Sequence, residues 1–179
     1  MSTAVASTST LNSPSMPQAI RPIVEVKNIS KTYAGGVEAL NGISLEFPEG
    51  QLTTLLGPSG CGKTTLLKII AGLIPASSGK VFVDGREING PGPERAFVFQ
   101  DFALMPWASV IRNAAFGLEL RGVAKSEREA VAERYIERVG LKGFEQKYPH
   151  ELSGGMRQRV GLARALAVNA KVVLMDEPF

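Results

Sequence analysis

Cysteine and histidine are almost absent from this sequence. Its 179 residues contain one cysteine, Cys61, and one histidine, His150. A single cysteine can form no internal disulfide, and it excludes a zinc site built from clustered cysteines. This usage fits a reducing compartment. We expect His150, which precedes a glycine-rich segment, to lie in a solvent-facing loop.

Long apolar runs are missing as well. No stretch approaches the ~20 apolar residues that a membrane-spanning helix needs, so any role at a membrane must come through a partner. The formal net charge of +3 is small and dispersed, and gives no argument for a nucleic-acid partner. A chain of this length can bury one ordinary core, and one domain is expected. Residues 1–22 are rich in Ser, Thr, Ala and Pro without periodicity, and we expect a disordered tail there.

The sharpest motif that is present is GPSGCGKTT at residues 57–65, which matches G-x-x-x-x-G-K-[ST]. An apolar segment, residues 52–56, precedes it as a buried strand would, and helical spacing follows it. Backbone N–H groups of the glycines and of the helix start suit a phosphate, Lys63 can reach the β- and γ-phosphates, and Thr64 can offer its hydroxyl to Mg²⁺. An accidental glycine-rich turn is the alternative. The residues expected to contact ATP here are Gly57, Pro58, Ser59, Gly60, Cys61, Gly62, Lys63, Thr64 and Thr65. Cys61 is interpreted as a small filler, with a redox-sensitive thiol as the alternative.

Periodicity along the remaining chain predicts an α/β fold. Strands are expected at residues 23–29, 43–47, 80–83, 96–99 and 171–175. Helices are expected after the phosphate loop and at residues 110–120, 126–141 and 153–168, the second of these with a capping box of Ser126 and Glu129. The pattern indicates a P-loop NTPase core sheet, an N-terminal antiparallel β part, and a helical insertion at about residues 101–168.

Two further segments carry chemistry. Asp176 and Glu177 follow the apolar run VVLM, which places two carboxylates at the edge of a sheet where α/β proteins bind ligands. Asp176 would hold Mg²⁺, and Glu177 would orient the attacking water as a general base. In LSGGMRQ, Ser153 can cap a helix while Gly154 and Gly155 leave its first N–H groups uncovered, which predicts a second anion site. The alternatives are an exposed acidic pair and a helix cap without a ligand.

Together these segments resemble the nucleotide-binding subunit of an ATP-binding cassette (ABC) transporter, over residues 23–179. LSGGMRQRV ahead of VVLMDEPF is the most specific part. The resemblance implies that Tyr33 stacks on adenine and that Gln100 touches Mg²⁺ and the attacking water. A surface tyrosine and a polar strand end are the alternatives. The family continues beyond DEPF with a further loop, strand and switch histidine, so we expect a 179-residue product to be poorly stable and to hydrolyse ATP slowly.

The same resemblance implies partners. Two cassettes would sandwich ATP, with each Ser153 helix facing the partner's Lys63. Residues 102–107, from Phe102 to Trp107, would receive transmembrane permease subunits, with packing of the insertion onto the core as the alternative. A solute-binding protein would act indirectly. Residues 102–123 are similar to the corresponding segment in importers of nitrate, sulfonate and taurine. Membership of that group would place the protein peripherally at the cytoplasmic face of the inner membrane. A nucleotide-binding truncated cassette and a soluble ABC protein acting on ribosomes or DNA are the rival interpretations.

Overall fold

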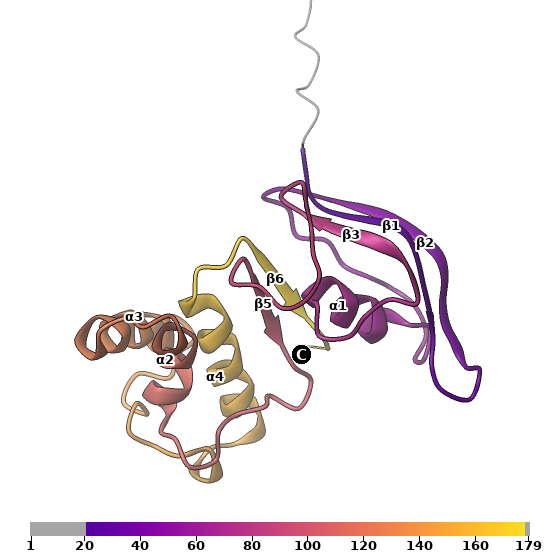
Figure 1. The fold of residues 1–179 in the computed structure, drawn as a ribbon. Coiled ribbons are helices and arrows are strands. Elements are labelled where there is room, and N and C mark those ends of the chain that lie inside the picture. Colours follow the sequence, from indigo (N-terminus) through magenta and orange to yellow (C-terminus); the bar gives the residue numbers. More distant parts are fainter. Residues whose placement is uncertain (1–20, 178–179) are drawn as a thin grey trace, which may run out of the picture.

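The computed structural model describes residues 21–177. The expected tail, residues 1–22, therefore lies outside the described residues except for Arg21 and Pro22. The described part has an α/β fold, as predicted, with two sheets and a group of helices (Figure 1). No helix within residues 21–177 has both the length and the apolar character needed to cross a bilayer.

An antiparallel sheet forms the N-terminal β part, in the order β2-β1-β3-β4. Its strands are β1 (Pro22–Thr32), β2 (Glu38–Pro48), β3 (Ser78–Val83) and β4 (Arg86–Glu87). The predicted strands 23–29, 43–47 and 80–83 are confirmed within it. Val24 and Val26 of β1 pair with Val83 and Val81 of β3, and all four side chains are buried. Alternation along these strands thus supplies one apolar face.

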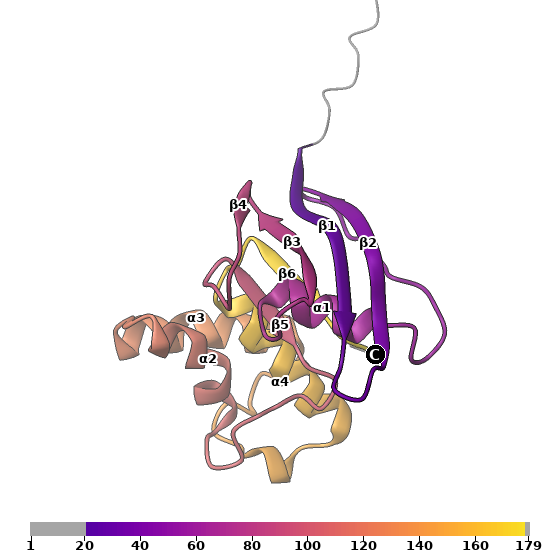
Figure 2. The same ribbon diagram turned by 45° about the vertical axis from the view of Figure 1, so that its right-hand side comes forward.

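A second, parallel pair of strands lies on the other side of helix α1. β5 (Arg95–Val98) pairs with β6 (Val172–Met175). The two strands were predicted from their apolar runs, and the structure adds their pairing. Helix α1 (Lys63–Ala71) lies between the two sheets (Figures 1 and 2). It buries Leu66, Ile69 and Ile70 in the cluster that includes the β1 and β3 valines and Leu174 of β6. The apolar face of this helix therefore packs in one cluster with residues of both sheets, and this fixes its position relative to them.

The strand predicted at residues 52–56 is wrong. Residues 51–58 have no strand conformation, and Leu52 and Leu56 are 93% and 89% exposed. The sheet that this segment would join consists of β5 and β6, which pair only with each other among the described residues. A segment without a neighbouring strand has no ladder to satisfy its backbone groups, so its apolar residues do not produce a strand.

Three helices form a separate apolar cluster. They are α2 (Val110–Leu120), α3 (Lys125–Arg138) and α4 (Gly154–Ala167), and the short 3₁₀ helix η1 (Pro149–Glu151) leads into α4. The three predicted helices are confirmed. Val110, Ile136 and Val160, one from each helix, are fully buried in this cluster. α4 also packs on β5 through Ala165, so it connects the helical group to the parallel strands.

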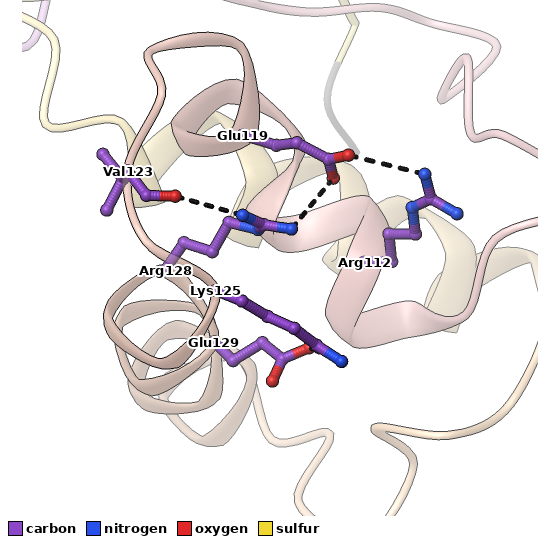
Figure 3. Close-up of polar contacts among 6 residues, drawn as sticks. All are labelled: Arg112, Glu119, Val123, Lys125, Arg128 and Glu129. Carbon is purple, nitrogen blue, oxygen red and sulfur yellow. Dashed lines mark hydrogen bonds and ion pairs between the residues drawn. The ribbon is translucent and has the colours of Figure 1, made fainter.

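A polar contact joins α2 to α3 at the surface of this group. The carboxylate of Glu119 lies 3.4 Å from Arg112 on its own helix and 3.9 Å from Arg128 on α3 (Figure 3). The predicted capping box is wrong: α3 begins at Lys125 after Ala124, and no side chain caps it. Because the helix starts one residue before Ser126, Glu129 falls one turn after Lys125 and pairs with it at 3.9 Å.

Candidate functional site

The phosphate loop ends where α1 begins, at Gly62. This residue has a φ of 94°, and a Cβ there would lie 2.5 Å from the carbonyl oxygen of Ala39. Only glycine fits this position without displacing backbone. No side chain caps α1 and no acidic residue lies in its first turn. The first N–H groups of α1 and the positive end of its dipole therefore face the loop unopposed.

The ammonium group of Lys63 is held over this loop. Its Nζ donates to the carbonyl oxygens of Gly57 and Pro58, each at 2.8 Å, and lies 3.7 Å from Sγ of Cys61. A Cβ at Gly57 would lie 2.7 Å from that sulfur, so Cys61 occupies the space that Gly57 leaves. This packing supports the interpretation of Cys61 as a filler. A full positive charge and a helix start thus converge on one concave loop, which suits an anion.

Thr64 contacts Asp176 beside the loop. The Thr64 hydroxyl donates to Oδ1 of Asp176 at 2.7 Å, and Asp176 is only 5% exposed. Asp176 also extends the parallel ladder, since its N–H donates to the carbonyl of Val98. One carboxylate and one hydroxyl are oxygen ligands of the kind Mg²⁺ takes alongside substrate phosphates. Residues 21–177 contain no group of three or more His, Cys, Asp and Glu side chains that could hold a metal without such a substrate.

A second hydrogen-bonded pair lies at the same sheet edge. Nε2 of Gln100 donates to Oε2 of Glu177 at 2.9 Å. Gln100 follows β5 and Glu177 follows β6, and the carboxyl ends of neighbouring parallel strands meet at one edge. The parallel register, with Val98 opposite Met175, therefore brings together two residues separated by most of the helical group.

Tyr33 reaches the phosphate loop from the end of β1. Its hydroxyl lies 3.2 Å from Oγ1 of Thr65, and Nζ of Lys31 lies 5.3 Å from its ring centroid. The side chain is 42% exposed, so much of its ring stays open to solvent. A turn closed by the Tyr33 N–H to the Val37 carbonyl sets this direction. An exposed aromatic face next to an anion site can stack on a base.

Ser153, Gly154 and Gly155 lie apart from these residues. Ser153 caps α4, since its Oγ accepts from the Met156 N–H at 3.3 Å, and both glycines have open space where a Cβ would be. α4 leads into β6 at its other end, and a 14-residue helix is about 21 Å long. Among the described residues no hydrogen bond joins Ser153 to the phosphate loop. The start of α4, where a second anion site is predicted, is therefore exposed and contacts no residue of the loop by a hydrogen bond.

The remaining predicted positions lie at the surface of the helical group. Trp107, at the end of residues 102–107, is 73% exposed, whereas Phe102 is half-buried. His150 is exposed, as expected, and stacks on Tyr148 with ring centroids 5.9 Å apart. The exposed indole is the strongest sign of a partner surface in this segment.

Sequence reasoning missed Arg164. This residue of α4 donates to the carbonyl oxygens of Ala103 at 2.7 Å and Phe102 at 2.8 Å, just after Gln100. Burial lowers the pKa of its guanidinium from the usual value. The signal in the sequence was an arginine between Ala163 and Ala165, two buried positions of an apolar helix.

A family model described as ABC transporter matches residues 40–179. The chain belongs to this ABC transporter family. An uncharacterized ABC transporter ATP-binding protein of Methanocaldococcus jannaschii is 53% identical over 159 residues, which cover 87% of this chain and 60% of that protein. The taurine import ATP-binding protein TauB of Escherichia coli K12 is 52% identical over 153 residues, covering 84% and 60%. The chain thus spans 60% of the length of each of these relatives.

Solved ABC cassettes share the fold. The dimeric structure of a bacterial ABC transporter cassette matches with a TM-score of 0.81 and 33% identity, covering 87% of this chain and 74% of that one. A dimeric post-hydrolysis state of an ATP-binding cassette bound to ADP and Pi matches with a TM-score of 0.80 and 34% identity, with the same coverage. The predicted family and the ABC cassette fold are therefore confirmed.

Proposed function

We propose that this ABC protein is the ATP-binding and ATP-hydrolysing subunit that energises an importer of small anions of the taurine, sulfonate or nitrate kind. One observation carries the proposal. The pairs Thr64–Asp176 and Gln100–Glu177 meet at one sheet edge, next to a lysine loop at a free helix start. These are the groups that phosphoryl transfer to water needs: an anion cradle, oxygen ligands, and a carboxylate that can receive a proton.

The described residues take distinct roles in this proposal. The loop N–H groups and Lys63 bind the phosphates, and Tyr33 stacks on the adenine. Thr64, Gln100 and Asp176 fit a Mg²⁺ ion, which when bound neutralises charge on the phosphates. Glu177 holds the attacking water in line and accepts its proton as general base, while Gln100, bonded to Glu177, fixes the direction of that carboxylate.

A second copy completes the site. The start of α4 is exposed, and the side chain of Ser153 caps it. Among the described residues Ser153 makes no hydrogen bond to the phosphate loop. In the proposal it binds the phosphates held by the partner's Lys63, so that ATP closes two cassettes and hydrolysis opens them. Both solved relatives named above are dimers, and one holds ADP and Pi.

Transport requires membrane partners. In the proposal the cassette spans residues 23–179, and its helical subdomain covers residues 101–168 approximately. The permease subunits contact this subdomain at residues 102–107, around the exposed Trp107. The protein then lies at the cytoplasmic face of the membrane as a peripheral subunit, with a solute-binding protein acting through the permease. The similarity to TauB, a taurine import protein, supports the sulfonate class.

Two measurements on the full-length protein test this proposal. First, ATPase activity is compared between wild type and Glu177→Gln, which keeps size and hydrogen bonding but removes the base; we expect a loss of at least about 100-fold with ATP binding retained. Second, sulfonate-limited growth and uptake of labelled taurine are measured in cells lacking the protein. Equal ATPase rates would overturn the catalytic roles, and unchanged uptake of taurine, other sulfonates and nitrate would overturn the transport role.

A further inference from the structure

The turn that follows Gln100 has an unusual backbone. Phe102 and Ala103 are consecutive residues with left-handed φ angles of 58° and 44°, and neither is glycine. The turn is tight, since the Phe102 N–H donates to the Phe99 carbonyl at 3.1 Å. Non-glycine residues in this region are strained and persist only where the surroundings hold them.

Arg164 supplies that hold. Its two guanidinium nitrogens donate to the Ala103 and Phe102 carbonyls, so one side chain fixes both strained residues. Charge-assisted hydrogen bonds are about twice as strong as neutral ones. Among residues 21–177 no carboxylate lies within ion-pair distance of Arg164, so the dipoles of these two carbonyl groups stabilise its positive charge. One turn earlier on the same helix, a Cβ at Gly161 would lie in ordinary van der Waals contact with the Phe102 carbonyl, at 3.6 Å, so the turn packs directly on α4.

The turn is clamped between the helix and the catalytic edge. On one side β5 ends next to Gln100, whose amide reaches Glu177 at 2.9 Å. On the other side Arg164 belongs to α4, the same rigid helix whose first residue follows Ser153.

We propose that Arg164 is a positioning residue for ATP hydrolysis, which holds the turn at residues 99–103 so that Gln100 meets Glu177. This inference rests on the proposed catalytic roles of Gln100 and Glu177.

A double-mutant cycle on the full-length protein tests it. Arg164→Gln should lower kcat by about 10- to 100-fold with little change in the KM for ATP, the loss that a displacement of about 1 Å causes at a reacting centre. In a Gln100→Ala background the same substitution should lower kcat by less than about twofold, because the group it positions is gone. A purely structural role would give equal losses in both backgrounds.

Arg121→Gln is the matched control. Arg121 also donates to two carbonyls, of Val168 at 2.7 Å and Pro93 at 2.5 Å, but these lie away from Gln100. Its effect on kcat should be the same with and without Gln100. If Arg164→Gln fails to fold, Arg164→Lys, which retains a donor, enters the same cycle with a smaller expected loss.

The outcomes distinguish the positioning role of Arg164 from the proposed catalytic role of Gln100. Additive losses for Arg164 and Gln100, beside a normal loss for Gln100→Ala, would overturn the positioning role alone. An unchanged kcat for Gln100→Ala would remove the proposed role of Gln100 and this inference with it. Non-additive losses for Arg121 as well would also overturn the inference, since the coupling would then be general to the fold.

Discussion

The hydroxyl of Thr64 donates to the carboxylate of Asp176 at 2.7 Å, across 112 positions of sequence. Thr64 lies in the first turn of α1 and Asp176 follows the buried strand β6. The contact therefore joins α1, whose start is the proposed phosphate site, to the sheet that carries the two acidic residues. It also leaves two hard oxygen atoms side by side at the loop, where the phosphates of a nucleotide would arrive.

Replacing Asp176 by Asn should uncouple nucleotide binding from Mg²⁺. The amide keeps the size of the side chain and an oxygen for Thr64, but it removes the charge that a divalent cation needs. We expect the affinity for Mg-ATP to fall by at least about 10- to 100-fold, the effect of losing even a supporting ligand group at a metal site. ATP binding in EDTA should be retained. Titration of a fluorescent ATP analogue with and without Mg²⁺ measures both quantities.

Asp101→Asn is the control for this prediction. Asp101 is exposed and adjacent to Gln100, and its carboxylate makes no hydrogen bond or ion pair within residues 21–177. The same charge change there should leave the Mg²⁺ dependence as in wild type. A wild-type response of Asp176→Asn would show that this carboxylate holds no metal.

Replacing Tyr33 by Ala should weaken ATP binding through the base. Stacking of a base on an aromatic side chain contributes about 1–3 kcal/mol, so the Kd for ATP should rise by about 5- to 150-fold. Tyr33→Phe should bind nearly as wild type, because the contact of the hydroxyl with Thr65 lies in a solvent-exposed setting and the ring is kept. Isothermal titration with ATP and with inorganic triphosphate distinguishes loss of stacking, since triphosphate binding should not change.

Tyr148→Ala serves as the matched control, since Tyr148 is 43% exposed against 42% for Tyr33 and stacks on His150 away from the loop. Its ATP affinity should equal that of wild type. Equal losses for both tyrosines would mean that Tyr33 acts through general stability and not through adenine.

The sequence was most informative where local pattern and chemistry coincide. Glycine, lysine and threonine at fixed spacing, with an apolar helix behind them, predicted the helix α1, and the phosphate-binding role of the loop stays a proposal. Tyr33 and Gln100 came from a family resemblance and the acidic pair from its place after an apolar run, and the parallel register of β5 and β6 brings Gln100 and Glu177 into contact. No local sequence signal predicts that register, because it depends on which strands become neighbours in the sheet.

The misses have a common physical cause. Residues 52–56 have a strand pattern but no strand beside them, and Ser126 has capping chemistry but a helix that starts one residue earlier. Arg164 is polar at an inward position, and its role depends on strained carbonyls contributed by another segment. Pairing partners, exact helix starts and backbone strain are properties of tertiary structure, which local propensity does not determine.

Ser153 variants should separate helix capping from nucleotide-driven dimerisation. Ser153→Ala removes the acceptor for the Met156 N–H and should cost about 0.5–2 kcal/mol of stability. Ser153→Asp caps α4 equally well but adds a negative charge at the helix start, where a partner's phosphates would lie. We expect Ser153→Asp to keep the Tm of wild type and to lose ATP-induced dimers.

Sedimentation of full-length protein carrying Glu177→Gln, with and without ATP, is the readout for these variants. In this background Ser153→Ala should form fewer dimers than the parent, and Ser153→Asp none. Dimer formation by Ser153→Asp at the ATP concentration that suffices for the parent would contradict the placement of this helix against phosphate.

The ion pair of Asp84 with Lys171 should make stability depend on acid pH. Asp84 lies in the turn between β3 and β4, and Lys171 precedes β6, so the 2.5 Å contact connects the two sheets. The hydrogen bond and charge of Lys171, with Arg21 and Arg86, hold the pKa of Asp84 below its usual value. A lowered folded-state pKa contributes stability above the unfolded value of about 3.9, and this contribution is lost as pH falls through the folded pKa.

Asp84→Asn should therefore lower the Tm at pH 7, and this effect should shrink as the pH falls through the folded-state pKa of Asp84. Asn suits the left-handed φ of 50° at this position, so the turn itself is retained. The loss at pH 7 should be small, because the pair is exposed to solvent and screened by salt. Lys171→Met should show the same dependence on pH. Thermal unfolding of both variants between pH 3 and pH 7 checks this, and an equal loss at both pH values would assign Asp84 a role in the turn instead of in the ion pair.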